Sequence, residues 1–222
     1  MDSRTQAIVL HRTNYGEYDR IIQCITTDGK KSLIAKGVRK ERSKLAGGIE
    51  LFSLSDTTAH HGRGDLDILT SARLVKFYSR ILEDYPKLQF GYEVLKVISA
   101  RSDQIDDPEF FDLTRSILEF INHSDNLILA EVWFYLNLAR VCGDELNLHV
   151  DTAGEKLIES STYIFNTSDQ SFQKSDRGPI TARHIKFLRL VTTNQLDLVA
   201  RVSDITDLLP DCLPIAKSIS QL

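Results

Sequence analysis

Cysteine is scarce in this sequence, and its positions argue against two common uses of thiols. Only Cys24, Cys142 and Cys212 occur in 222 residues, an odd number spread along the whole chain. They do not make the disulfide framework of a small secreted domain, and none belongs to the closely spaced pair typical of a structural zinc site. We therefore expect a protein of the reducing cytoplasm that carries no metal or other cofactor.

Long apolar runs are missing as well. Arg12 interrupts the apolar residues that begin at Ala7, so the first residues do not have the pattern of a signal peptide. The most apolar stretch, 126–139, has fourteen residues and includes Glu131, whereas a helix needs about 20 residues to cross a membrane. The sequence predicts a buried helix here and no membrane partner.

The signatures of common enzymes are also absent. The sequence has no glycine-rich phosphate loop, no GxSxG elbow, no HExxH pair and no CxxC motif. His60, His61, Asp65 and Asp67 flank an expected turn, but neighbouring residues of a strand point to opposite faces, so the two histidines do not converge on a metal. We expect a protein that is not an enzyme and has no catalytic residues.

Charge is distributed unevenly along the chain. The net charge is −4 at pH 7. Residues 1–80 hold 14 Lys and Arg against 9 Asp and Glu, a net +5, while residues 81–222 hold 13 against 22, a net −9. A surface for nucleic acid is therefore expected in the first part of the chain.

The first 76 residues have the pattern of a small β-domain. Runs of β-branched and aromatic residues alternate with turn signals such as Asp28-Gly29, which suits a two-residue hairpin. The five candidate strands are 5–13, 18–27, 31–38, 49–60 and 66–69. Because short strands expose their edges unless the sheet closes, residues 1–76 are predicted to form a five-stranded OB-type barrel.

From residue 71 onward the apolar residues follow a helical period, and residues 77–222 are predicted to form a helical domain. The first apolar helix face comprises Leu74, Phe77, Tyr78, Ile81 and Leu82. Further helices are expected over 88–100, 108–122, 127–142 and 182–191. The chain as a whole is predicted to be α+β, with a barrel followed by helices.

Two segments of the helical domain depart from this period. Residues 155–177 have the pattern of a short β-ribbon, with extended runs at 157–161, 163–166 and 171–172. The stretch after Asp204 contains Pro210 and Pro214, so we expect only short helical turns there.

The strongest functional signal is a basic window, Gly29–Lys44. Its seven cations are Lys30, Lys31, Lys36, Arg39, Lys40, Arg42 and Lys44. Only one acid, Glu41, accompanies them. In an OB barrel the third strand and the loop after it lie where such folds take single strands, so these side chains could follow DNA phosphates. A solvated loop without a ligand explains the window equally well.

Aromatic residues lie near the first hairpin turn. Tyr15 and Tyr18 stand beside Arg12 and Arg20, and aromatic faces can stack on bases of any sequence. Taken alone, a tyrosine in a turn is more often a partly buried hydrophobic residue. Together with the basic window, the four residues extend the predicted DNA site.

Residues 7–75 resemble the N-terminal domain of the RecO recombination-mediator family. The matching pieces are Tyr15-Gly16-Glu17 with Asp19-Arg20, Gly29-Lys30, Lys36-Gly37-Val38-Arg39-Lys40 running into Ser43-Lys44-Leu45, and Gly64-Asp65-Leu66. Phe134–Ala139, before Gly143, resembles the family's central helix. The resemblance implies a mediator of DNA repair and homologous recombination that binds single-stranded DNA, with duplex DNA as a second ligand, and anneals complementary strands.

The resemblance also implies protein partners, and this sequence differs from many family members in its ribbon. The partners are a RecR-like protein, with which a RecA-like recombinase is loaded, and the C-terminal tail of single-stranded-DNA-binding protein. Arg101, Arg115 and Arg140 are candidates to meet that acidic tail, and the expected location is the cytoplasm, at the nucleoid. Many members hold a zinc ion with four cysteines in the ribbon, whereas residues 155–177 contain no cysteine. We therefore expect the ribbon to be held together by apolar residues such as Ile158, Tyr163, Ile164 and Phe165.

A second function class stays open. The acidic helical domain could be the working part of a protein-interaction adaptor that does not bind DNA, with the basic loop serving only solubility. Binding of an oligonucleotide that weakens steeply with salt would distinguish the mediator from the adaptor.

Overall fold

A computed structural model describes residues 2–62 and 66–220 of the chain. It divides into two compact units, residues 1–123 and 124–222. The strands of the first unit are β1 (Asp2–Tyr15), β2 (Asp19–Thr26), β3 (Gly29–Ala35), β4 (Ser53–His60) and β5 (Asp67–Phe77). Its helices are η1 (Ala46–Gly48), η2 (Ser79–Glu83), α1 (Tyr85–Arg101) and α2 (Glu109–His123). Gly64 and Asp65, which belong to the family resemblance, lie outside the described residues.

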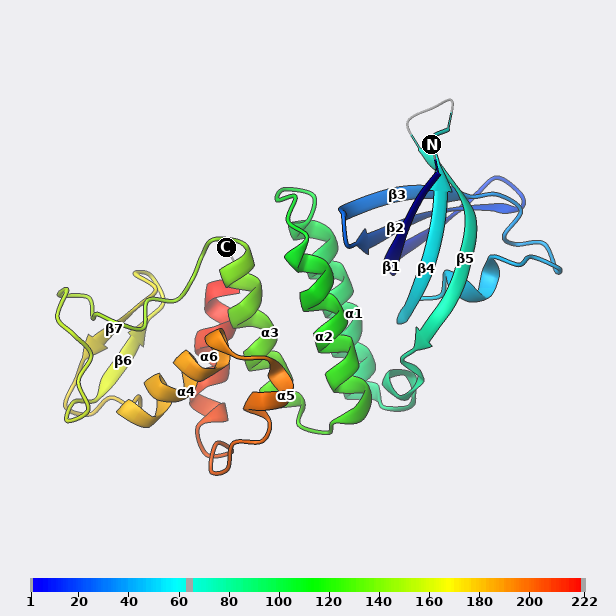
Figure 1. The fold of residues 1–222 in the computed structure, drawn as a ribbon. Helices are drawn as coiled ribbons and strands as arrows, with labels where there is room; N and C mark the ends of the chain where they lie inside the picture. The colour runs from blue at the N-terminus through cyan, green and yellow to red at the C-terminus, as the bar shows by residue number, and fades with distance from the viewer. Residues whose placement is uncertain (1, 63–65, 221–222) are drawn as a thin grey trace. The chain divides into compact units, whose positions relative to one another are not determined.

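The five strands close into a barrel in the order β1-β2-β3-β5-β4 (Figure 1). All neighbours are antiparallel except β3 and β5, which pair in parallel only at Leu33 with Asp67 and Ile34 with Ile68. Alternate residues of each strand point inward, as the period of two requires. The core includes Ala7, Val9, Ile22, Cys24, Leu33, Ala35, Ala59, Leu69 and Ala72. The predicted α+β class and the OB-type barrel are confirmed.

The helix expected from residue 71 is wrong. Residues up to Phe77 extend β5, which pairs with β4 along its length from Ile68 to Phe77. Leu74, Phe77 and Ile81 have helical spacing, but they belong to two different elements. Leu74 and Phe77 lie at the end of β5 and are 45% and 40% exposed, whereas Ile81 lies in the 3-10 turn η2 and is fully buried. Pairing with β4 decided the conformation here, against the local period.

Helices α1 and α2 belong to the same compact unit as the barrel. They contact β1 and β2, whose outward-facing Ile8 and Leu10 are buried. Phe52 lies edge-on to the ring of Tyr92 in α1, with the ring centroids 5.1 Å apart. The division between the units therefore follows α2, while the barrel strands themselves end at Phe77.

The second unit is built around a single buried helix. Its helices are α3 (Leu127–Val141), α4 (Ala182–Thr193), α5 (Leu196–Val199) and α6 (Leu209–Ser220). Residues Leu129–Ala139 of α3 are buried apart from Glu131, and α6 lies alongside α3 (Figure 1). The buried Asn137 amide donates to the carbonyls of Trp133 at 2.9 Å and Val191 at 3.2 Å, which ties α3 to α4. The prediction of a buried helix over 126–139 is confirmed.

The predicted ribbon is present as β6 (Tyr163–Asn166) and β7 (Ser171–Lys174), but 157–161 is not a strand. Tyr163 and Phe172 are fully buried, whereas Ile158 and Ile164 are exposed, so only some of the expected apolar residues hold the ribbon. The Asp151 carboxylate accepts the backbone N–H groups of Ala153 at 2.9 Å and Glu155 at 3.0 Å. This carboxylate and the buried rings organise a ribbon that has no cysteine.

The C-terminal segment is more regular than expected. Residues 209–220 form one helix, α6, with Pro214 inside it. Proline removes one backbone N–H from the helix, and packing of Cys212, Ile215, Ala216 and Ile219, all buried, offsets that loss. No helix in the described part of the chain is long and apolar enough to cross a membrane.

Candidate nucleic-acid interface

The β1–β2 turn and the loop that follows β3 are hydrogen-bonded to each other and form one surface. The Arg39 N–H donates to the Tyr18 carbonyl at 2.9 Å, and the Gly37 N–H donates to Asp19 Oδ1 at 2.6 Å. Gly16 and Gly37 have φ values of 58° and 64°, which a residue with a side chain adopts less readily. Asp19 therefore positions the basic loop, a role that the site prediction missed although the residue belongs to the resemblance.

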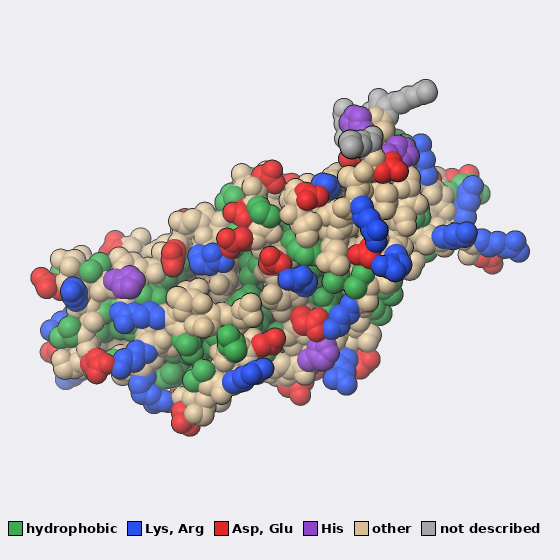
Figure 2. Space-filling view, viewed as in Figure 1, with side chains coloured by type: hydrophobic (Ala, Val, Ile, Leu, Met, Phe, Trp, Pro, Cys, Tyr) green, Lys and Arg blue, Asp and Glu red, His purple; other side chains and the backbone are tan. Residues whose placement is uncertain are grey.

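The loop after β3 is folded back on itself in successive turns. The Lys40 N–H donates to the Gly37 carbonyl at 3.1 Å, and the Ser43 N–H donates to the Lys40 carbonyl at 3.0 Å. Five cations of this loop are exposed: Lys36, Arg39, Lys40, Arg42 and Lys44. Among the described residues none of the five forms an ion pair, and Figure 2 shows Lys and Arg side chains gathered where this loop projects from the barrel.

Two tyrosines complete the surface. Tyr15 is 55% exposed and Tyr18 is 44% exposed. The Lys40 ammonium lies over the Tyr18 ring, 5.3 Å from its centroid, and a hydrogen bond with Glu17 raises the pKa of the Tyr18 phenol. We call the five exposed cations together with Tyr15 and Tyr18 the basic loop surface.

Four of the predicted DNA-binding cations do not stand free on this surface. The Lys30 side chain is 10% exposed and pairs with Asp103 at 2.7 Å. Lys31 pairs with Asp28 at 3.2 Å and Arg12 with Glu50 at 2.6 Å. The Nε–H of Arg20 donates to Asn14 Oδ1 at 3.1 Å. These side chains have partners inside the first unit, which distinguishes them from the five exposed loop cations.

The three arginines predicted to meet a partner tail belong to three different helices. Arg101 and Arg115 lie in the first unit, on α1 and α2, and Arg140 lies in the second, in the last turn of α3. Arg115 is paired with Asp112 at 2.8 Å. Arg101 and Arg140 are each half-buried at a helix C-terminus, where a cation interacts favourably with the helix dipole.

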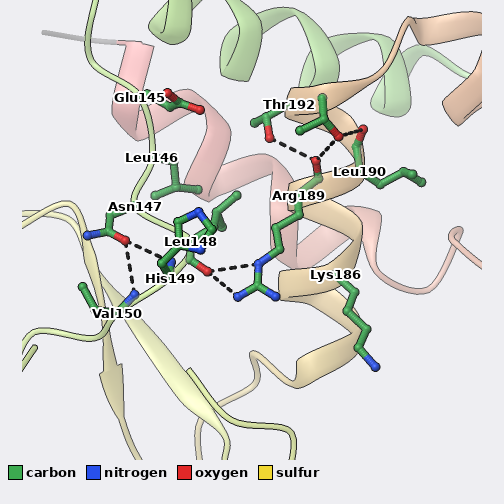
Figure 3. A pocket seen from close by; sticks show the side chains of 11 residues that line it. Glu145, Leu146, Asn147, Leu148, His149, Val150, Lys186, Arg189, Leu190 and Thr192 are labelled. Carbon is green, nitrogen blue, oxygen red and sulfur yellow. Dashed lines mark hydrogen bonds between the residues drawn. The ribbon is translucent and has the colours of Figure 1, made fainter. Parts of the chain in front are cut away.

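A cavity of about 720 Å³ in the second unit brings other cations together with apolar groups. It lies between α4 and the segment 145–150. In Figure 3 Arg189 reaches from α4 to the Leu148 carbonyl, to which its Nε and Nη2 groups donate at 3.1 and 2.6 Å. Leu146, Leu148 and Leu190 supply apolar lining. In the described part of the chain Arg189 forms no ion pair, which leaves its charge available to an anion.

The described residues contain no candidate metal cluster, and two of the three free thiols are buried. No three His, Cys, Asp or Glu side chains within 2–62 and 66–220 are placed to hold one metal ion. Burial raises the pKa of both Cys24 and Cys212 to about 12, so neither thiol ionises near neutral pH. What the surface can supply is positive charge and aromatic faces.

The described chain thus combines a closed OB barrel that has an exposed cationic loop with a helical unit that has a small ribbon. The family model "Recombination protein O N terminal" matches residues 1–78, and "Recombination protein O C terminal" matches residues 83–208. The chain belongs to the RecO family, as the sequence resemblance indicated, and the family assignment supports a role in DNA repair and recombination.

Individual relatives agree with this assignment. A DNA repair protein RecO of Dehalococcoides mccartyi is 26% identical over 209 residues, which is 90% of this chain and 82% of the relative. One of Rubrobacter xylanophilus is 34% identical over 142 residues, 63% of this chain and 57% of the relative. One of Listeria monocytogenes is 26% identical over 214 residues, 90% and 80% of the two chains.

Proposed function

We propose that this RecO-family chain binds single-stranded DNA on the basic loop surface, anneals complementary strands and, with a RecR-like partner, helps to load a RecA-like recombinase. The observation that carries the proposal is the group of five exposed loop cations without internal ion pairs beside two exposed tyrosines. Like charges held together repel each other unless an anion neutralises them, and the phosphates of a DNA strand are such an anion.

The chemistry of annealing fits a surface without catalytic groups. Two complementary strands repel each other through their phosphates, and loop cations reduce that repulsion by replacing the counterions around each strand. Tyr15 and Tyr18 can stack on unpaired bases of any sequence. Because phosphate contacts are independent of sequence, duplex DNA is expected to bind the same cations, without the contribution from stacking.

The intact chain is expected to anneal two complementary oligonucleotides faster than they anneal alone at low salt. The reaction should need no nucleotide and should slow as salt screens the basic loop surface. Fluorescence quenching between labelled strands, followed at several salt concentrations, measures the rate. A reaction that required ATP, or no acceleration at low salt, would exclude the annealing mechanism and favour the protein-interaction adaptor.

We further propose that the Arg189 cavity receives the C-terminal tail of single-stranded-DNA-binding protein. Such tails are acidic and end in apolar residues. Arg189 can bind a carboxylate, because its guanidinium carries donors beyond the two groups used for Leu148. Leu146 and Leu190 can pack against an apolar side chain. Neither Arg101, Arg115 nor Arg140 lines this cavity.

Replacing Arg189 by Ala is expected to weaken binding of a labelled acidic peptide with an apolar C-terminal residue by at least about tenfold, the effect of losing one charged hydrogen bond. Fluorescence anisotropy measures the affinity. Arg201→Ala, which removes an exposed arginine of the same unit, is the control and should leave the affinity unchanged. If Arg189→Lys and Arg189→Ala both bind like the parent chain, the tail lies elsewhere.

A further inference from the structure

The first unit contains a groove that none of the predicted site residues lines. It has a volume of about 600 Å³ and lies between α1 and the outer face of β1 and β2, a size typical of ligand sites. Tyr92, Lys96 and Ser99 belong to its helix wall, because residues three or four apart lie on one face of a helix. The strands supply the polar residues of the opposite wall, which are His11, Thr13 and Gln23. We call this space the α1 groove.

The strand wall of the α1 groove is shaped by a bulge in β1. The pairing of β1 with β2 shifts register between Val9 and His11. Consecutive residues of a strand normally face opposite sides, but here Leu10 and His11 both line the groove. Leu10 is 5% exposed and belongs to the floor, whereas His11 is exposed at the rim. Bulges recur beside binding sites, where they redirect a side chain, and this one places a polar rim above an apolar floor.

Two side chains of α1 are exposed at the mouth of the groove. Tyr92 is 49% exposed, and its edge-on contact with Phe52 holds the ring in place. Lys96 is exposed and forms no ion pair in the described part of the chain. An aromatic ring beside an unpaired cation is the combination with which proteins hold single strands of any sequence.

Uncharged polar groups line the strand side of the groove. Gln23 Oε1 accepts a hydrogen bond from the Ser99 hydroxyl at 3.5 Å, and the Thr13 hydroxyl lies 3.3 Å from His11 Nδ1. An amide, a hydroxyl and an imidazole together offer both donors and acceptors. Such a mixed set can form hydrogen bonds with the edges of more than one kind of unpaired base.

An exposed strip of β1 connects the α1 groove to the basic loop surface. His11, Thr13 and Tyr15 alternate along the outer face of the strand, because the core residues of β1 and β2 face inward. All three side chains are exposed. Four residues at about 3.3 Å each put Tyr15 roughly 13 Å from His11. A single strand that contacts Tyr15 therefore needs only a short further stretch to reach the groove.

We propose that the α1 groove takes unpaired bases of the DNA single strand whose phosphates lie on the basic loop surface. This inference rests on the proposed function and adds a second contact region to it. A base stacks on Tyr92, its edge meets Gln23 or Thr13, and Lys96 binds a neighbouring phosphate. The groove thus supplies contacts that only an unpaired base can make.

Exposure and charge favour DNA over a protein segment as the occupant. Leu10 and Leu95 are 5% and 2% exposed, so the apolar part is a buried floor and not the apolar centre of a protein interface. Asp103 lines the far end of the groove and pairs with Lys30 at 2.7 Å. It follows Lys96 by seven residues, about 10 Å at the rise of a helix, which is the distance over which salt screens exposed charges. A phosphate at Lys96 is therefore not opposed by Asp103.

Tyr92→Ala in the full chain should lower the affinity for a thymidine oligonucleotide of about 12 nucleotides, a length that OB folds cover, by at least about fivefold. An abasic oligonucleotide of the same length, which keeps the phosphates, should bind the variant and the parent chain equally. Tyr92→Phe keeps the ring and should bind like the parent chain. Tyr85→Ala is the matched control, because Tyr85 lies on the same helix, is 74% exposed and does not line the groove.

Lys96→Met is a second variant and should reduce the salt slope for the thymidine oligonucleotide by about 0.7, the effect of one phosphate contact. Arg80→Met, which removes an exposed cation of the same unit outside the groove, should leave the slope unchanged. A thymidine oligonucleotide that carries 5-iodouracil should form a photo-crosslink to Tyr92, identified by mass spectrometry of the digested chain.

The inference is overturned if Tyr92→Ala binds the thymidine oligonucleotide like the parent chain, or if it weakens the thymidine and abasic oligonucleotides equally. Crosslinks confined to Tyr15 and Tyr18 would also exclude the groove. Loss of binding to a RecR-like partner, with oligonucleotide affinity intact, would assign the groove to a protein. Replacement of the loop cations Lys36, Arg39 and Lys40 by Ala tests the basic loop surface separately, since it should weaken the thymidine and abasic oligonucleotides alike. If that variant binds both like the parent chain, the proposed function fails, whatever the groove variants show.

Discussion

Replacing Lys36, Arg39 and Lys40 together by Ala is expected to lower the affinity for single-stranded DNA by at least about tenfold at low salt. The three side chains are exposed and belong to one loop, and each phosphate contact contributes about 0.7 to the slope of log affinity against log salt on single strands. Loss of all three should therefore reduce the slope by about 2. Anisotropy of a labelled oligonucleotide, titrated at several salt concentrations, measures both quantities.

A control with the same loss of charge separates a local site from a general effect of net charge. Lys156, Lys174 and Arg177 are exposed in the ribbon segment of the second unit, and their replacement by Ala removes as many positive charges. This variant should keep the affinity and most of the salt slope of the parent chain. If both triple variants weaken binding equally, net charge rather than the basic loop surface explains the interaction.

The loop cations could be predicted from the sequence because their distinguishing property is local. Lys36, Arg39 and Lys40 follow a predicted strand and surround a glycine. These features alone indicate an exposed basic loop after the strand, whatever the strand's place in the barrel. What the sequence could not reveal is which cations have internal partners. Lys30 belongs to the same basic window, but its partner Asp103 lies 73 residues later, just after α1, and only the packing of helix on barrel brings the two together.

The same limit explains one wrong sequence prediction and one cavity that the sequence did not indicate. Leu74 and Phe77 satisfy a helical spacing, and only pairing with β4 makes them part of a strand. The Arg189 cavity joins the segment 145–150 to α4, about forty residues away in the chain. Local period and composition contain no information about such pairings, whereas the five-stranded barrel and the buried α3 followed from alternation and hydrophobicity that are continuous along the chain.

Lys30→Met is expected to destabilise the first unit and to leave DNA binding unchanged. The Lys30 ammonium donates to the Ser99 carbonyl at 2.8 Å, to Ser99 Oγ at 3.0 Å and to Asp103 Oδ1 at 2.7 Å. Ser99 and Asp103 lie at the C-terminal end of α1, where a cation also interacts with the helix dipole. Methionine keeps the apolar stem but provides no donor.

Because hydrogen bonds of charged groups contribute about 1.5–3 kcal/mol each in net stability, and these bonds share one ammonium, a loss of about 2–3 kcal/mol is expected. For a chain of this size about 2 kcal/mol lowers the melting temperature by roughly 4–8 °C. Lys31→Met is the control at the neighbouring residue, since its more exposed pair with Asp28 contributes at most about 1 kcal/mol. Should Lys30→Met instead reduce the salt slope of oligonucleotide binding while the melting temperature stays unchanged, Lys30 would leave α1 to contact DNA, and the ion pair with Asp103 would not define its role.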